Sequence, residues 1–384
     1  MECAFLERGF RPFFFFGALY AVISAFIWGG IYSGMIEAPA FMADPILWHA
    51  HEMIYGFAMA IVAGFLLTAV ANWTGTAPTR QTSLALLVGV WGVARFVINV
   101  DLGLPNTVVY GIELLFIPCI AISLSIPLVK KWNKRNFVFL FLLMVLFICD
   151  LLFLKSQDKK YLYSAAMVIV MMISLIGGRI IPAFTVAALR QKGEQAFQTP
   201  QPKTDGAALL SLVALIVLML LDQGQGYLMA AVASTSLVVH LLRFRHYHSH
   251  RTLNDPLLWI LHLGYVWLLV GLVFFALCAV DLVAFSTGFH AFTAGAIGTM
   301  TLGMMVRVAL GHTGRPLVAS KLTTGAFVLM QAAVVLRVVV PIINPENIDV
   351  YIPISAYLWV ASFVIYLWVY SPILWQPRPD GRKA

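Results

Sequence analysis

The sequence predicts an all-α polytopic membrane protein with about twelve transmembrane helices and both termini in the cytoplasm. Of its 384 residues, 61% are hydrophobic and 11% are charged, too few to cover a soluble protein of this length with polar groups. A helix needs about 20 apolar residues to cross the hydrocarbon core. Segments close to that length are 10–33, 46–72, 81–100, 105–129, 136–154, 161–189, 206–222, 226–245, 256–281, 285–310, 317–341 and 349–373.

Lysine and arginine residues orient these spans, because basic residues accumulate in cytoplasmic loops. With a cytoplasmic N-terminus, eighteen of them fall on the cytoplasmic side and three on the outer side. The outer three are Lys155, Lys159 and Lys160. The cytoplasmic eighteen are Arg8, Arg11, Arg80, Lys130, Lys131, Lys134, Arg135, Arg190, Lys192, Lys203, Arg243, Arg245, Arg251, Arg315, Lys321, Arg378, Arg382 and Lys383. The net charge of +8 therefore indicates membrane topology and acidic lipid, and no nucleic-acid partner is expected.

A polar segment rich in Gln and Pro, residues 190–205, is the longest stretch outside the predicted spans. It predicts a linker between two six-helix halves, 1–189 and 206–384, of one integral-membrane domain, 1–384. No cysteine pair has metal-ligand or disulfide spacing, and no phosphate-binding loop is present. The chemistry is therefore expected within the membrane or at its surface.

One pattern occurs twice, 239 residues apart and with identical spacing. His51-x4-Gly56-x7-Gly64-x9-Thr74-Gly75 returns as His290-x4-Gly295-x7-Gly303-x9-Thr313-Gly314. A histidine in hydrocarbon needs a partner, and haem iron or another metal suits a neutral imidazole. We expect His51 and His290 to hold one haem from opposite sides. The alternative is that each histidine joins two helices by an ordinary hydrogen bond.

The polar residues within spans fall into two groups by depth. Near the expected outer surface lie His49, His51, Glu52, Arg95, Glu113, His290 and Arg337. Near the expected cytoplasmic surface lie Arg179, His240, His262, Arg307 and His312. His290 and His312 are 22 residues apart, or roughly 33 Å of helix, so they cannot share a metal. Either the inner histidines, His240, His262 and His312, hold a second haem or offer an open coordination position, or they are structural.

Helical phase separates the histidines of the second span. His49 and His51 lie about 200° apart around a helix, so they cannot both face one iron unless the helix begins later. His49 and Glu52 share a face, which predicts a hydrogen-bonded pair or a second metal such as copper or non-haem iron. The metal-ligand candidates are therefore His49, His51, Glu52 and His290.

Arginines within spans are costly and need anionic partners. Arg95, Arg179, Arg307 and Arg337 face few acids, chiefly Glu52, Glu113 and Asp150. The two propionates of a haem would supply negative charge, which makes these arginines cofactor-binding candidates. Lipid phosphate at the span ends is the alternative for Arg307 and Arg337.

Several motifs together resemble one family. They are Phe10-Arg-Pro-Phe-Phe14, Trp48-His-Ala-His-Glu-Met53, Ala63-Gly-Phe-Leu-Leu-Thr-Ala69 with Asn72-Trp-Thr-Gly75, Gly177-Gly-Arg-Ile-Ile-Pro182 and Gly311-His-Thr-Gly-Arg-Pro316. In order and over nearly the whole chain, they resemble the NnrS family. Ala71 departs from the pattern, where Pro is expected. The resemblance implies a bacterial inner-membrane protein of twelve spans that contains haem and copper and belongs to denitrification and nitric oxide defence.

Three functions remain open at this point. The first is a nitric oxide reductase with one or two b haems, copper or non-haem iron, and a quinol as the electron donor. Glu52 and Glu113 would deliver its protons, because carboxylates are the available intramembrane relays. The second is a non-catalytic haem or copper protein that binds nitric oxide or protects metals from it. The third is a secondary transporter. Monomer and oligomer are both compatible with the sequence.

Overall fold

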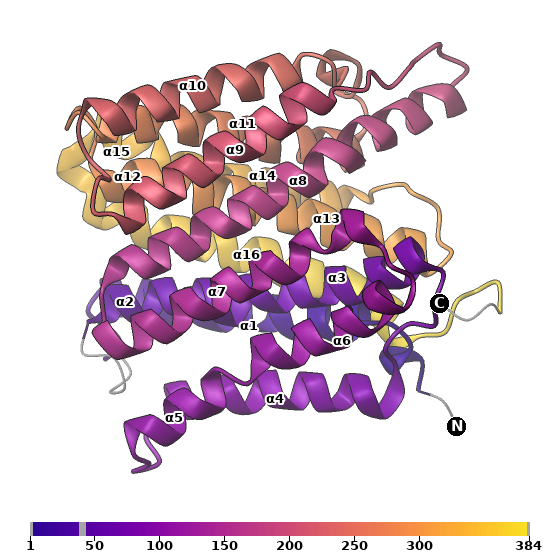
Figure 1. Ribbon diagram of the computed structural model, residues 1–384, viewed down its shortest axis with the longest axis horizontal. Helices are drawn as coiled ribbons and strands as arrows, with labels where there is room; N and C mark the ends of the chain where they lie inside the picture. The colour runs from indigo at the N-terminus through magenta and orange to yellow at the C-terminus, as the bar shows by residue number, and fades with distance from the viewer. Residues whose placement is uncertain (1–2, 38–43, 382–384) are drawn as a thin grey trace. The chain divides into compact units, whose positions relative to one another are not determined.

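The computed structural model describes residues 3–37 and 44–381 (Figure 1). Arg382 and Lys383, two of the predicted cytoplasmic charges, lie outside the described residues. Within the described part of the chain, every regular element is helical, and twelve helices are long and apolar enough to cross a membrane. The predicted all-α, multi-pass class is confirmed. The side of the membrane on which the termini lie stays a prediction.

The spans begin and end close to the predicted positions. Their bounds are Phe10–Tyr32, Pro45–Thr74, Gln81–Asn99, Asn106–Lys130, Lys134–Ser156, Lys159–Gln191, Pro202–Leu220, Tyr227–Phe244, Pro256–Cys278, Phe285–His312, Lys321–Ile343 and Pro345–Trp375. In Figure 1 the single-helix spans are α1 (Phe10–Tyr32), α4 (Gln81–Asn99), α7 (Val138–Ser156), α8 (Lys159–Gln191), α9 (Pro202–Leu220), α10 (Tyr227–Phe244), α11 (Pro256–Cys278) and α16 (Ile348–Trp375). The composite spans are α5 (Asn106–Glu113) with α6 (Phe116–Lys130), and α14 (Lys321–Val338) with α15 (Val340–Ile343).

The two spans that carry the repeated pattern share an unusual construction. In the second span, α2 (Pro45–His51) passes through a π-helix, η2 (Glu52–Ala58), into α3 (Met59–Thr74). In the tenth, α12 (Phe285–His290) passes through a π-helix, η5 (Ala291–Gly298), into α13 (Thr299–His312). Each π-helix thus begins directly after the repeated histidine. Such wide turns occur frequently at functional sites.

The repeated glycines allow neighbouring helices to approach closely. A Cβ at Gly56 would lie 2.4 Å from Cε1 of Tyr20, and one at Gly295 would lie 2.9 Å from Cγ of Trp267. The last glycine of each copy ends its helix, because Gly75 and Gly314 have φ of +63° and +71°. The glycines of the repeat therefore have a packing role, and the histidine is the repeated residue whose side chain can bind a ligand.

By their contacts, the helices form two compact units. Unit 1 comprises the described residues of 1–165, 305–317 and 359–384, and unit 2 comprises 166–304 and 318–358. Long helices such as α8, α13 and α16 contribute residues to both units. The division into halves 1–189 and 206–384 stays a prediction. The segment between α8 and α9, residues 192–201, has no regular structure, as expected for the linker.

Candidate functional site

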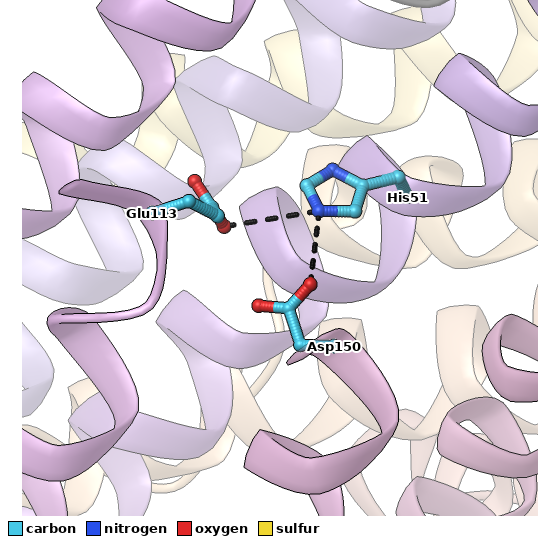
Figure 2. Close-up of side chains that lie close together, drawn as sticks. All are labelled: His51, Glu113 and Asp150. Atoms are coloured by element: carbon cyan, nitrogen blue, oxygen red, sulfur yellow. Dashed lines mark hydrogen bonds and ion pairs between the residues drawn. The ribbon is translucent and has the colours of Figure 1, made fainter. Parts of the chain in front are cut away.

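A histidine and two carboxylates meet inside unit 1. His51 ends α2, Glu113 ends α5 and Asp150 lies in α7, and Figure 2 shows their side chains directed at one another. Nε2 of His51 lies 3.3 Å from Oδ1 of Asp150 and 3.9 Å from Oε1 of Glu113. Within the described residues, this group has ligand atoms close enough to hold one metal ion, all within 4.8 Å of one another. We call His51, Glu113 and Asp150 the acid cluster.

The acid cluster is shielded from solvent. His51 is 0% exposed, Asp150 1% and Glu113 3%. Buried charges of this kind must be paired, protonated or bound to a metal ion. Burial therefore makes the cluster a functional candidate with a stated physical reason.

A third carboxylate and an arginine extend the acid cluster. Nδ1 of His51 lies 2.7 Å from Oε1 of Glu52, the first residue of η2. The same oxygen accepts a hydrogen bond of 2.5 Å from Nη1 of Arg95 in α4, and Nη2 of Arg95 donates to both carboxylate oxygens of Glu113. Arg95 thus ties Glu52 to Glu113. Both terminal nitrogens of this arginine are engaged by protein carboxylates.

Tyr20 and Asn99 bind Glu52 directly and Trp48 binds Asn99, and the sequence analysis gave none of the three a role in the site. The hydroxyl of Tyr20 in α1 donates a hydrogen bond to Oε2 of Glu52. Asn99 donates to the same oxygen at 3.0 Å and to the Tyr20 hydroxyl at 3.1 Å. Trp48 donates from Nε1 to Oδ1 of Asn99 at 2.8 Å. Tyr20 lies in the middle of α1 and Asn99 ends α4, and only their contacts with Glu52 mark them as part of the site.

The π-helix also contributes directly to this region. Trp91 donates from Nε1 to the carbonyl oxygen of Gly56 at 3.0 Å, so a side chain bonds to a backbone group of the wide turn. A Cβ at Gly56 would meet Cδ of Arg95 at 3.3 Å as well as Tyr20. Gly56 therefore makes room for two side chains that hold Glu52 in place.

The formal charges in this region do not balance. Glu52, Glu113 and Asp150 provide three negative charges when ionised, Arg95 provides one positive charge, and a neutral His51 provides none. The difference is two negative charges in a dry interior, where uncompensated charge is costly. One divalent cation, or bound protons, would restore neutrality.

The donor set tests which of the expected cofactors fits. One imidazole nitrogen and several carboxylate oxygens suit iron, manganese or zinc, and they accept Cu(II) better than Cu(I), which prefers sulfur ligands. Haem iron would need His51 to offer a nitrogen away from carboxylates, whereas both ring nitrogens lie beside them. The acid cluster therefore fits a non-haem metal ion better than haem.

The other two candidate ligands near the predicted outer surface have different surroundings. The ring of His49 stacks on Trp28 at 4.3 Å with an interplanar angle of 15°. His290 donates from Nδ1 to the carbonyl oxygen of Ser286 at 2.5 Å, so Nε2 is the ring nitrogen that the predicted metal would use. His290 belongs to unit 2 and His51 to unit 1, so their pairing on one haem stays a prediction.

Each of the three inner histidines has a hydrogen-bond partner within its own unit. In unit 2, His240 donates from Nδ1 to the Ser236 carbonyl oxygen at 2.9 Å, and Nε2 of His262 lies 2.9 Å from the Thr185 hydroxyl. His262 also borders a hollow of about 490 Å³, whose lining residues are Phe244, Ser249, His250, Thr252, Leu253, Trp259, Leu263 and Val266. In unit 1, Nδ1 of His312 lies 3.4 Å from Nη1 of Arg8.

The remaining candidate arginines lie apart from the acid cluster's hydrogen bonds. Arg307 is buried, and Arg179 and Arg337 are half-buried. A fourth arginine, Arg243, is expected from the sequence only as a cytoplasmic charge, yet it is 2% exposed. Its Nε donates to Asp205 at 2.6 Å and its Nη1 donates to the carbonyl oxygen of Ser174 at 2.8 Å. Sequence position alone does not distinguish a buried arginine at a helix end from an exposed one.

The comparison with protein families decides the identity of the chain. A family model described as NnrS protein matches residues 4–378. The chain belongs to the NnrS family. Membership fits a multi-pass membrane protein of the nitric oxide response, as the motifs predicted. No curated protein matches the chain.

Proposed function

We propose that this NnrS-family protein reduces nitric oxide at the acid cluster, with a metal ion held by His51, Glu113 and Asp150. The supporting observation is the burial of one histidine and three carboxylates, Glu52 included, around a single arginine inside a membrane-spanning unit. A non-haem iron or copper ion bound there would supply redox chemistry and a binding position for nitric oxide. The reaction is 2 NO + 2 e⁻ + 2 H⁺ → N₂O + H₂O.

The residues of the chain have distinct roles in this proposal. His51, Glu113 and Asp150 hold the ion, and Arg95 fixes the orientation of Glu113 through two hydrogen bonds. Protons must reach a site that water does not, so a chain of titratable groups is required. Glu52 connects the Tyr20 hydroxyl to Nδ1 of His51, and these contacts form such a chain.

The electrons require a membrane donor. No Cys-x2-Cys-His haem attachment motif occurs in the sequence, so we propose a quinol as the donor and one or two b haems as the relay. The ligands proposed for haem are His290 and the inner histidines His240, His262 and His312. The fold class and the family support a bacterial inner membrane as the location.

Anaerobic turnover by purified protein tests the reductase proposal. Wild-type protein supplied with nitric oxide and a reduced quinol is expected to produce N₂O, and Asp150→Asn and Glu113→Gln to lose both bound metal and turnover. Lys131→Gln, an exposed change elsewhere in unit 1, is the matched control. Nitric oxide binding without N₂O under saturating reductant would indicate a binding protein. A colourless, metal-free preparation would contradict both interpretations and favour a transporter.

A further inference from the structure

Four arginines gather at one end of unit 1, and none belongs to the acid cluster. Arg8 and Arg11 lie at the start of α1, Arg315 follows α13 and Arg378 follows α16. Arg8 and Arg378 both contact His312, through Nδ1 at 3.4 Å and through its carbonyl oxygen at 2.9 Å. We call Arg8, Arg11, Arg315 and Arg378 the arginine cluster.

Two of these arginines have carboxylate partners. Arg378 forms two hydrogen bonds with Asp380, at 2.9 and 2.6 Å. Arg11 lies 3.7 Å from Glu7 and donates from Nη1 to two carbonyl oxygens at the C-terminal end of α16 and just beyond it, so it anchors the C-terminal segment. Together with its contact to His312, these hydrogen bonds engage all three guanidinium nitrogens of Arg378. Of the Arg11 nitrogens, they engage only Nη1.

The other two arginines have no ion pair with a carboxylate among the described residues. Arg8 contacts the Asn72 side chain, at 3.3 Å, and the His312 ring, and Glu7 lies close enough to attract its charge. Arg8 lies close enough to Arg378 for their charges to repel, and burial lowers the pKa of Arg315.

Several guanidinium nitrogens of the arginine cluster are shielded from solvent and lack an acceptor. They are Nε of Arg8, Nε and Nη2 of Arg11, and Nη1 of Arg315, and the Arg11 side chain is 0% exposed. Arg11 also lies close enough to Arg8 and Arg315 for their charges to repel. Buried donors are normally satisfied, so these nitrogens point to an acceptor with several oxygens.

We propose that Arg8, Arg11 and Arg315 bind a phosphate group. Guanidinium groups match the oxygens of phosphate in charge and in planar geometry, and a phosphate would accept from donors that the protein leaves unmatched. The cluster lies at the ends of spans that the predicted topology places on one membrane surface. The phosphate group is therefore supplied either by the headgroup of an anionic phospholipid or by free phosphate.

Two binding measurements on purified full-length protein in uncharged detergent distinguish these sources. Titration with inorganic phosphate, followed by calorimetry, measures the free anion. Titration with mixed micelles of phosphatidylglycerol, against phosphatidylcholine alone, measures the headgroup. Binding in either arm supports the site, and added salt is expected to weaken it.

Variants then assign the binding to these residues. Arg8→Gln and Arg315→Gln are each expected to weaken phosphate or lipid binding about tenfold or more, whereas Lys131→Gln keeps wild-type affinity. Arg315→Lys keeps the charge but loses the forked geometry, so its affinity falls between the two. It also serves as the test if a glutamine variant does not give a single monodisperse species.

The site is independent of the metal site proposed for the reductase, because Arg315→Gln alters no contact of the acid cluster and should keep the wild-type content of non-haem metal. Wild-type protein that binds neither probe, or well-folded glutamine variants that bind both as tightly as wild type, would overturn it. A glutamine variant that loses haem but keeps the phosphate affinity of wild type would also overturn it, because the arginines would then bind a haem propionate.

Discussion

The guanidinium of Arg243 occupies the space that a side chain at Gly178 would fill. A Cβ at Gly178 would lie 1.7 Å from Nη2 and 2.2 Å from Cζ of Arg243. Arg243 is buried and bonded to Asp205 and to the Ser174 carbonyl oxygen, so these contacts hold its guanidinium in place. One glycine of the Gly177-Gly-Arg-Ile-Ile-Pro182 motif is thus explained by an arginine far along the chain.

Gly178→Ala is therefore expected to destabilise the protein by about 1–3 kcal/mol, because it overpacks the helix contact and displaces a buried arginine from its hydrogen bonds. Thermal unfolding in detergent measures the effect. Gly177→Ala is the matched control, since its Cβ would meet the end of Ile181 at 3.3 Å and Cδ2 of Tyr265 at 3.8 Å, without a severe overlap. Equal stability of the two variants would contradict this account of Gly178.

Gly56→Ala tests whether the packing around η2 positions the acid cluster. The new Cβ would displace Tyr20 and press on Arg95, two side chains that bind Glu52. We expect a loss of about 1–3 kcal/mol in stability and a lower metal content. Gly89→Ala in α4 meets no atom within 4 Å and should leave both quantities unchanged. A Gly56→Ala protein with full metal content would show that Glu52 is held by other means.

Much of the fold could be predicted from composition alone. Long apolar stretches define spans because lipid offers the backbone no hydrogen bonds, so each stretch must be helical. The cost of placing charge in hydrocarbon likewise singles out Glu52, Arg95 and Glu113 among the residues of the predicted spans. Asp150 is harder to recognise, because nothing in the sequence places α7 beside α2.

The details of the site could not be predicted, for two physical reasons. The predicted phase assumes the α-helical 100° per residue, and the π-helix that begins at Glu52 changes that angle. The α-helical phase places Glu52 on the face of His49, and in the structure its carboxylate contacts the His51 ring, so the pair with His49 stays a prediction. Tyr20 and Asn99 depend on how α1 and α4 pack, which no single-helix pattern contains.

Arg95→Gln should reveal how strongly the acid cluster needs positive charge. The change removes the guanidinium from Glu52 and Glu113, and breaking a buried pair costs about 3–5 kcal/mol. Bound cation would replace part of the lost charge, so the thermal stability of the variant should depend on added Fe(II) or Mn(II) more than that of wild type. Arg135→Gln, an exposed change in unit 1, is the control. A variant as stable as wild type without metal would argue against a charge imbalance.

Metal affinity should rise with pH. A metal ion binds the neutral imidazole of His51 and the ionised carboxylates of Glu113 and Asp150, so protons compete for every ligand. Where one proton is displaced per ion, each unit of pH raises affinity about tenfold. Equilibrium dialysis of Fe(II) or Zn(II) at several pH values measures the slope. An affinity independent of pH would mean that the ion binds elsewhere.

The repeated histidines give the last prediction, because two interpretations of His51 compete. If His51 and His290 share one haem, His51→Ala and His290→Ala should each abolish the same low-spin absorption. If His51 serves the acid cluster, His51→Ala should lose non-haem metal and keep the haem spectrum, while His290→Ala does the reverse. Carboxylates beside both nitrogens of His51 favour the second outcome. The corresponding position after His290 is Ala291 and not a glutamate, so only the first copy of the repeat has an acidic neighbour. Absorption spectra and metal analysis of the same two purified variants decide between them.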